Sequence, residues 1–532
     1  PTPPSDIGAL LQQMQLPAAK LRQSPQFDPD PQAVVAPTAA DQPGHVKIRG
    51  FRFSGNRLID TPTLQRQVSA WLGKRLTLTG LQQPVQAITN FYRSRGYLLG
   101  RAYLPEQQIG DGVVEIGIVE AVYSRISLND NDTLRGNATA PLEKLQQGGA
   151  VDNRSLEHAL LLLKDLPGVE VSSTLTPGAD PGTTDLLVEL QEGVKYQADL
   201  RADNFGSSHY GRYRIGAGIE LNNPSSLGDR LSLRGLHGFS GGKTDYGSLF
   251  YQLPWGRSGL TMTTGFTYMD YRLGGDYKSL QAVGDATVYT LGGRFPLIRS
   301  LRKNLYVTTR YTRKWLSDKY QATGFSKNKQ SHAITLQLHG DHRDSLWGGG
   351  INEFSLSLKH GDLNLDSQSR LVDAAAADTA DRFSLLNLSY RRTQYLNQNW
   401  HLRGSFFLQR SNKNLDSSEK LQLSGISGVR AYPSGELSAD QGELLRLNCY
   451  RRLGEKLQAG IFYDLGHGKV NRDSYPGAEK SRTLRAVGLT LSAVPLPDWY
   501  VDATLAMQLG DQSATSEPDR DARVWLQLIR TF

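Results

Sequence analysis

Arg430 and Asp464 are the two side chains whose placement in the sequence suggests a specific interaction. Arg430 lies near the middle of the longest polar connection in a region of short alternating strands, residues 411–441. Asp464 lies in such a strand, and because alternate residues of a strand face opposite sides, it shares its face with Phe462 and Gly466. An arginine and a carboxylate form an ion pair, which is stronger where water is partly excluded.

The connection is long enough to bring these two side chains together inside a membrane barrel. Folded as a hairpin with about 15 residues per arm at roughly 3.3 Å each, it could reach about 50 Å. The apolar band of such a barrel is only about 25 Å tall. Arg430 could therefore meet Asp464 in the lumen, or it could lie in an exposed turn while Asp464 bonds to lumen neighbours. The residues alone leave both interpretations open.

Other motifs give little support for catalysis. The segment 237–244 is one residue short of a phosphate-binding loop, because His237 stands where the first glycine is required and no helix follows. We interpret it as a glycine-rich turn. His339 and His342 flank Asp341, but no third ligand lies at a usable spacing, which favours a solvated turn over a metal site.

No HExxH, GxSxG or Cys/His motif appears in the sequence. We therefore predict no catalytic residue, no metal and no cofactor. A barrel protease or lipase with a site assembled from loop residues remains an alternative.

The composition excludes several classes of protein. Of 532 residues 38% are hydrophobic, and no run approaches the 18 or so apolar residues that a spanning helix needs, which excludes a helical membrane protein. The net charge is +8, but lysine and arginine are scattered, so no nucleic-acid partner is predicted. The single Cys449 forms no internal disulfide and is interpreted as a lipid-facing side chain. Because Pro1 is not followed by the pattern of a signal peptide, we interpret the numbering as starting after a removed one.

The first 22 residues contain a short amphipathic helix. Its apolar residues follow the i, i+3, i+4, i+7 spacing of one helix face, at Ile7, Leu10, Leu11 and Met14. Residues 23–45 are rich in proline and poor in large apolar side chains, which predicts an extended linker. The helix is therefore tethered to the rest of the chain rather than packed against its sequence neighbours.

Two copies of a β-α-α-β-β pattern follow, in residues 46–121 and 122–195, and predict two small α+β domains. From residue 196 to 532 the periodicity is two, with room for about 16 strands of about 9 to 11 residues. Connections after even-numbered strands are mostly tight. Most of those after odd-numbered strands are long and polar, among them 318–330 and 361–380.

Short turns at one end and long loops at the other are typical of an outer-membrane barrel. Tryptophans at the tight turns fit an interfacial girdle, namely Trp255, Trp347, Trp400 and Trp499. The terminal Phe532 resembles the recognition signal of bacterial outer-membrane barrels, although Arg530 stands where an apolar residue is expected. The sequence thus predicts a mostly β protein, a transmembrane antiparallel β-barrel of about 16 strands preceded by two α+β domains and a helix.

Residues 5–532 resemble the outer-membrane transporters of two-partner secretion (TpsB type), in the superfamily of the BamA assembly factor. The two α+β units are similar to polypeptide-transport-associated (POTRA) domains, and segments 97–107 and 112–120 are similar to the end of the family's first POTRA domain. The family's Val-Arg-Gly-Tyr/Phe signature resembles Val429, Arg430, Ala431 and Tyr432, with alanine in place of glycine. Its Phe-x-Asp-x-Gly partner motif resembles Phe462, Asp464 and Gly466.

The resemblance implies that Arg430 lies at the tip of a loop inside the barrel and pairs with Asp464, and that residues 1–22 are a plug helix. It implies secretion of one large unfolded exoprotein (TpsA type) from periplasm to cell surface without nucleotide hydrolysis. Outer-membrane lipid and the barrel-assembly machinery are the other expected partners. A general assembly factor, which usually carries more POTRA domains, is the alternative. A plain porin would have neither the POTRA domains nor the plug helix, and a structural or adhesive barrel would need no Arg-Asp pair between loop and lumen.

Overall fold

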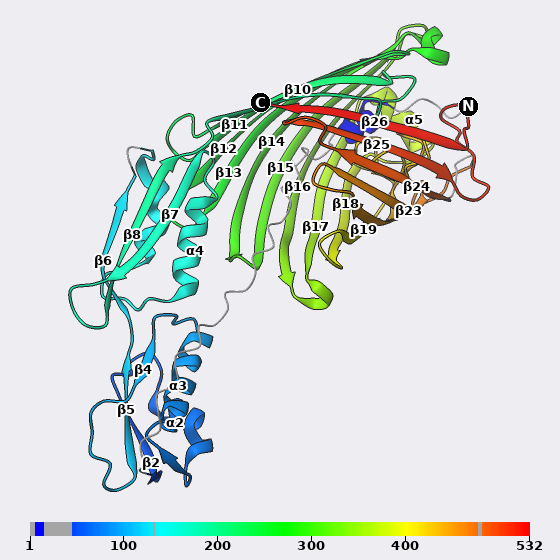
Figure 1. Cartoon of the computed structure of the whole chain (residues 1–532). Coiled ribbons are helices and arrows are strands. Elements are labelled where there is room, and N and C mark those ends of the chain that lie inside the picture. The colour runs from blue at the N-terminus through cyan, green and yellow to red at the C-terminus, as the bar shows by residue number, and fades with distance from the viewer. Residues whose placement is uncertain (1–5, 15–44, 131–132, 477–480) are drawn as a thin grey trace.

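The computed structural model describes residues 6–14, 45–130, 133–476 and 481–532. A short helix, two α+β domains and a large barrel follow one another along the chain, and the two domains extend from one end of the barrel (Figure 1). The predicted linker 23–45 lies outside the described residues except for residue 45, as do residues 1–5 and 15–22 of the predicted plug segment.

The first domain packs helices against a three-stranded sheet. Its elements are β1 (His45–Lys47), β2 (Gly50–Ser54), α2 (Thr61–Val68), η1 (Ser69–Trp71), β3 (Arg75–Thr77), α3 (Gln82–Ser94), β4 (Arg101–Tyr103) and β5 (Val113–Val119). The sheet has the order β2-β5-β4, while β1 pairs with β3. Val85, Ile88 and Tyr92 of α3 are buried against Val114 and Ile116 of β5, because their spacing puts them on one helix face.

The second domain repeats this plan. Its elements are β6 (Val122–Asn129), η2 (Gly136–Lys144), α4 (Asn153–Lys164), β7 (Val169–Pro177) and β8 (Thr183–Glu192), with the sheet order β6-β8-β7. The first helical segment is a 3-10 helix, and Pro141 inside it removes a backbone donor that a regular α-helix would use. The carboxylate of Asp152 caps α4 by accepting from the backbone N–H groups of Arg154 and Ser155.

Sixteen antiparallel strands form a closed barrel, in which β9 hydrogen-bonds to both β10 and β26. Their bounds are β9 (Tyr196–Asp203), β10 (Tyr213–Asn222), β11 (Arg230–Phe239), β12 (Lys243–Trp255), β13 (Leu260–Arg272), β14 (Ala282–Arg299), β15 (Lys303–Tyr320), β16 (Phe325–Asp344), β17 (Gly350–Leu365), β18 (Asp381–Tyr395), β19 (Trp400–Ser411), β22 (Gln441–Arg452), β23 (Leu457–Lys469), β24 (Ser481–Ala493), β25 (Trp499–Gln508) and β26 (Ala522–Thr531). The predicted fold class is confirmed.

Two predictions about connections are wrong. Residues 318–330 are not a long polar loop, because β15 and β16 pair as far as Tyr320 and Phe325 and only 321–324 join them. His339, Asp341 and His342 lie within β16 rather than in a turn. In both places the polar residues predicted a loop. Antiparallel strands can, however, carry polar side chains on a face that meets water and still keep their backbone hydrogen bonds. Further on, α5 (Ser367–Ala374) occupies part of the expected loop 361–380.

Side chains alternate between the outer surface and the lumen along each strand. In β10, Ile215 and Ile219 are exposed on the outside while Arg214 is buried inside. Cys449 lies between Leu402 and Ile461 of the neighbouring strands, and Ile461 is exposed on the outside, so Cys449 belongs to the outer face. Among the described residues, no helix is long and apolar enough to span a membrane.

Aromatic side chains mark the tight-turn end of the barrel. Trp255, Trp347 and Trp400 are exposed at turns there. The guanidinium of Arg530 lies 5.3 Å from the ring centre of Trp499 and 4.5 Å from that of Phe532. These cation-π contacts let an arginine occupy a strand position where an apolar residue was expected.

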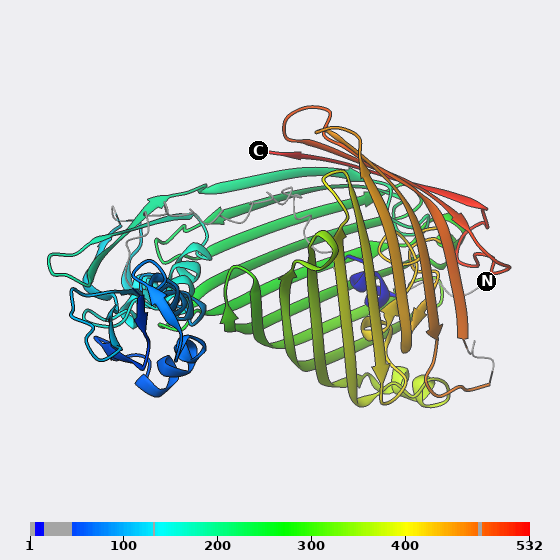
Figure 2. The ribbon, with the colours of Figure 1, turned by 60° about the horizontal axis from the view of Figure 1, so that its bottom comes forward.

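The second domain is fastened to the tight-turn end of the barrel. Arg299 of β14 donates to both carboxylate oxygens of Asp165, at 2.7 Å each. The backbone N–H of Leu301 donates to Glu157 of α4 at 2.5 Å, and that of Arg135 donates to the carbonyl of Ser226 at 2.7 Å. These contacts set the direction in which the two domains leave the barrel (Figures 1 and 2).

We expect Asp165→Asn to loosen this attachment, because the amide cannot bind the Arg299 guanidinium as a bidentate anion. Losing this partly exposed pair should cost about 1 kcal/mol or less and let the second domain move more freely relative to the barrel. The distribution of distances between spin labels at residues 191 and 453 should therefore become wider. The measurement is pulsed electron paramagnetic resonance in a Cys449→Ala background. Asp180→Asn, in the exposed turn between β7 and β8, is the matched control. Equal distributions in both variants would contradict the prediction.

Candidate functional site

The connection between β19 and β22 folds back into the barrel. It contains η5 (Ser417–Glu419) and a small hairpin made of β20 (Leu421–Gln422) and β21 (Ser438–Ala439). Val429 and Tyr432 at its tip are fully buried. They pack against lumen-facing side chains of the barrel strands, namely Leu444, Phe462, Leu484, Ala486 and Ala506. The re-entrant loop, residues 412–440, thus lies along one wall of the lumen.

Arg430 and Asp464 meet at the tip of this loop. The Nε and Nη2 atoms of Arg430 donate to the two carboxylate oxygens of Asp464 at 2.8 and 2.7 Å, and its backbone N–H donates to the same group at 3.2 Å. Nη2 also donates to Asn448, and the guanidinium lies 3.4 Å from the ring centre of Phe462. Both charged side chains are 5% exposed or less. The guanidinium is thus bound along its edge and covered on one face.

Neighbours of the pair explain the other residues of the two motifs. A Cβ at Gly466 would lie 2.8 Å from Cγ2 of Val429, so only glycine lets the loop approach strand β23 this closely. Ala431 is buried, and its φ is not positive, so the backbone at this position does not require the glycine of the family signature. The Tyr432 hydroxyl donates to the carbonyl of Gln512 at 2.8 Å.

Glu436 is a second anchor of the loop, and the sequence did not single it out. Its buried carboxylate accepts from Arg482 of β24 at 2.6 Å. It also accepts from the backbone N–H groups of Thr515 and Ser516 at 2.8 and 2.9 Å and from both of their hydroxyls. The loop is thereby joined to the connection between β25 and β26. A glutamate in a polar connection carries no sequence signal that would distinguish it from exposed ones.

The opposite end of the loop carries two buried carboxylates that bind lysines of the barrel wall. Glu419 accepts from Lys314 and Lys359, and Asp416 accepts from Lys329, each at 2.7 Å. Burial alone would raise the pKa of each carboxyl, but the lysines outweigh it, so the pKa of Glu419 and of Asp416 is lowered. Both groups are therefore charged at neutral pH. These lysines, too, were not predicted, since any lumen-facing charge fits the strand pattern.

Helix α1 (Ile7–Met14) lies inside the barrel beside this end of the loop, as Figure 2 shows. Ile7, Leu10 and Leu11 are buried, and Met14 is partly buried. They pack against lumen-facing residues of β13 to β15, among them Met269, Tyr271, Ala286 and Leu316. The predicted apolar face of the helix is thus the face that contacts the barrel wall.

Polar contacts fix the start of α1. Lys329 donates to Asp6 at 2.6 Å, and the backbone N–H of Ile7 donates to Asp318 at 2.9 Å. Burial raises the pKa of the Asp6 carboxyl, whereas the charge and the hydrogen bond of Lys329 lower it. The net shift of this pKa is downward. A Cβ at Gly8 would lie 2.7 Å from Oγ of Ser417, which shows how closely the helix approaches the loop. Lys329 therefore joins the helix, the loop and the barrel.

The structure brings the loop motif, the lumen motif and α1 into one continuous network, but Phe532 lies apart from it. The backbone N–H of Phe532 donates to the carbonyl of Ala198 at 2.9 Å, near the closure of the barrel. Within the described residues no group of three His, Cys, Asp or Glu side chains could hold a metal ion. His339 instead lies 3.1 Å from the hydroxyl of Thr308 on the lumen wall.

Comparison with known proteins agrees with this architecture. Residues 182–492 match the family model for the haemolysin secretion/activation protein ShlB/FhaC/HecB, and residues 46–121 match the ShlB-type POTRA domain. The heme/hemopexin transporter protein HuxB of Haemophilus influenzae is 28% identical over 495 residues, which cover 90% of this chain and 85% of HuxB.

Two solved structures share the fold. CdiB from Escherichia coli superposes with a TM-score of 0.75 at 19% identity, covering 94% of this chain and 93% of that one. BamA from Haemophilus ducreyi lacking POTRA domains 1-3 gives a TM-score of 0.51 at 14% identity, covering 92% and 99%. The family model, which spans more than half of the chain, decides between a secretion transporter and a general assembly factor.

The match to the family model, together with the closed barrel and the two α+β domains, identifies this chain as a transporter rather than an enzyme. The chain belongs to the haemolysin secretion/activation family ShlB/FhaC/HecB, and it is an outer-membrane transporter that secretes a partner exoprotein, with its POTRA domains in the periplasm.

Proposed function

We propose that the barrel is a conduit for an unfolded exoprotein of the TpsA type and that α1 and the re-entrant loop are its gate. The observation that carries the proposal is the buried pair of Arg430 and Asp464, which holds the loop in the lumen. No nucleotide is hydrolysed in this scheme. A closed barrel of 16 strands leaves an aqueous lumen, which is wide enough for a helix of about 10–12 Å diameter.

The periplasmic domains are the proposed site of capture. Strand β7 pairs with β8 on one side and has no neighbour on its other side among the described residues. Its residues beyond Val171 are exposed. An extended segment of the exoprotein can add to such an edge through main-chain hydrogen bonds. The exoprotein would therefore meet the POTRA domains before it reaches the barrel.

The general test is co-expression with the exoprotein encoded beside this chain, followed by assay of the medium and the cell surface. Appearance of the exoprotein outside the cell only when this chain is present would support the transport role. If depletion of this chain instead lowered the amounts of unrelated barrel proteins in the outer membrane, the alternative of a general assembly factor would be favoured.

Arg430→Ala should sharply reduce secretion. The substitution removes the guanidinium that binds both oxygens of Asp464 and leaves Arg446, whose Nε lies 3.4 Å from Oδ1, beside the buried carboxylate. Breaking a buried ion pair costs about 3–5 kcal/mol. Since Arg446 offsets part of that cost, we expect a smaller loss of stability and release of the loop tip from the wall. We expect secretion to fall at least tenfold while the barrel stays folded, as judged by its heat-dependent mobility on gels. Arg410→Ala removes an exposed arginine whose contact with Glu443 is 3.5 Å long, and it should secrete normally. Full secretion by Arg430→Ala would contradict the gate assignment.

Arg430→Lys is an informative third variant. A lysine keeps the charge but cannot bind both oxygens of Asp464 and cover the Phe462 ring at the same time. Its secretion should lie between that of Arg430→Ala and that of the unaltered chain.

Lys329→Gln should open the channel more often. Asp6 and Asp416 would then face each other without the buried cation that both now contact, so α1 should leave the lumen more readily. The measurement is single-channel recording in planar bilayers. Lys319→Gln, an exposed site on the adjacent strand, is the control. In a chain lacking residues 1–22, which should conduct more than the full chain, Lys329→Gln should add little. Equal open times in the Lys329 and Lys319 variants would refute the role of this lysine.

A further inference from the structure

A large polar cavity lies inside the barrel between α1 and the periplasmic turns. Its volume is about 1120 Å³, above the roughly 300–1,000 Å³ of typical small-molecule sites. Its lining includes Gly256 and Gly259 of one turn and Leu11 and Gln12 of α1. The cavity is therefore large enough for a segment of polypeptide, and it adjoins the helix that occupies the lumen.

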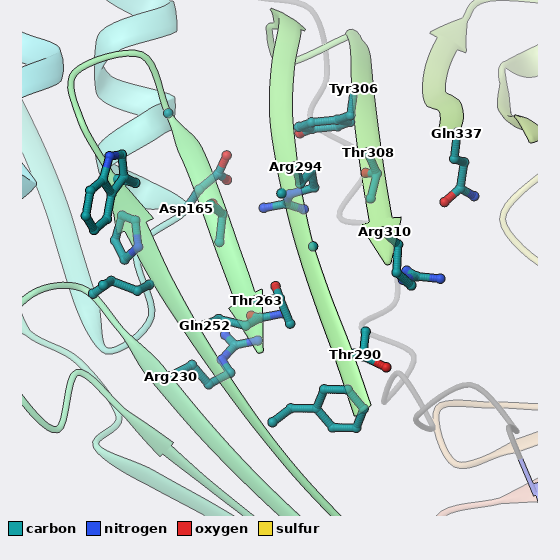
Figure 3. A pocket seen from close by; sticks show the side chains of 18 of the residues that line it. Asp165, Arg230, Gln252, Thr263, Thr290, Arg294, Tyr306, Thr308, Arg310 and Gln337 are labelled. Carbon is teal, nitrogen blue, oxygen red and sulfur yellow. The ribbon is translucent and has the colours of Figure 1, made fainter. Parts of the chain in front are cut away.

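Uncharged polar side chains cover much of its wall. Seven threonines from strands β13 to β16 line it, and Figure 3 shows three of them, Thr263, Thr290 and Thr308, together with Gln252 and Gln337. A hydroxyl can both donate and accept a hydrogen bond. Such a wall suits the N–H and C=O groups of an extended main chain better than it suits an apolar ligand.

The charge of the cavity wall is predominantly positive. Five lysine or arginine side chains line it against one carboxylate, that of Asp165. Asp165 is already bound through both oxygens by Arg299. Lys314 and Lys359, in turn, share the single carboxylate of Glu419. The wall thus keeps an excess of positive charge after its own ion pairs are counted.

Arg294 and Arg310 are the cations with the most open surroundings. Among the described residues, neither arginine has an ion-pair or hydrogen-bond partner, and the guanidinium of Arg294 lies 5.0 Å from the ring centre of Tyr306. In the strand register Arg294 lies opposite Thr308 and Arg310 lies opposite Gly292, so the two arginines are diagonal neighbours on adjacent strands (Figure 3). Two like charges at this spacing repel each other, and an anion between them removes the repulsion.

We propose that this cavity binds an acidic, extended segment of the exoprotein, with its carboxylates on Arg294 and Arg310 and its main chain along the threonines. Arginine binds carboxylates through two parallel hydrogen bonds, which gives such a site selectivity as well as affinity. The inference rests on the proposed function, because transport is what brings a polypeptide into the lumen. The acidic site adds one property to the proposed function: the cavity beside α1 prefers acidic segments of the exoprotein.

The test uses the purified full-length chain in detergent micelles and short fluorescent peptides that alternate aspartate with serine or asparagine with serine. We expect the acidic peptide to bind more tightly than the neutral one. The double variant Arg294→Gln/Arg310→Gln should weaken binding of the acidic peptide about tenfold at low salt and leave the neutral peptide unchanged. Arg294→Lys/Arg310→Lys should retain part of the affinity.

Arg313→Gln is the matched control, since Arg313 lies on the same strand as Arg310 but on the outer face, 4.7 Å from the Trp315 ring. Equal binding of the two peptides, no loss in the double glutamine variant, or the same loss in Arg313→Gln would each overturn the proposal. The secretion assay is separate. Arginine-dependent peptide binding without secretion would contradict the transport role alone, whereas secretion without such binding would contradict the acidic site alone.

Discussion

One buried ion pair joins the tip of the re-entrant loop to the barrel wall. Arg430 and Asp464 are both buried, and two side-chain hydrogen bonds of 2.8 and 2.7 Å join them. Either charge alone would be costly in that position, because neither could be hydrated. When the loop leaves the wall, Arg430 must therefore regain water, while Asp464 keeps Arg446, whose Nε lies 3.4 Å from Oδ1. The pairs of Glu436 with Arg482 and of Glu419 with Lys314 add further buried contacts between the loop and the wall.

The position of α1 follows from that of the loop. With its tip held on β23, the loop places η5 against β15 and β16, where Lys314 and Lys329 bind its carboxylates. The start of α1 then binds the same Lys329. A helix of eight residues is too short to be stable alone in water, so α1 depends on this seat and on the apolar wall beside it. A segment that is helical only in its seat can leave as an extended chain.

How far the sequence predicts this structure depends on the kind of signal. Alternation along β10 and β23 reports the face of each side chain, so the 16 strands and the inward direction of Asp464 can be derived from the pattern. Alternation does not show where the hydrogen bonding between two strands ends. The polar residues near Tyr320 and Phe325 predicted a loop, but they belong to paired strands of one long hairpin.

The contacts that join distant segments carry no such signal. Lys329 looks like any lumen-facing lysine, and only the fold brings it to Asp6 and Asp416. Glu436 likewise becomes recognisable only once Arg482 and the turn at Thr515 surround it. Local pattern thus predicts which face a residue takes. It does not predict which of many charges on that face will be paired and buried.

The distribution of charge links the re-entrant loop to the polar cavity. Lys314 and Lys359 hold Glu419 of the loop, and both also line the polar cavity. An acidic segment in that cavity would compete with Glu419 for these lysines while leaving Arg430 and Asp464 untouched. A ligand shifts an equilibrium only through a difference in its affinity for the two states. Here the difference would arise because lysines freed from Glu419 bind the incoming carboxylates better. Arrival of the exoprotein would thus loosen the seat of α1 first and the anchored tip of the loop last.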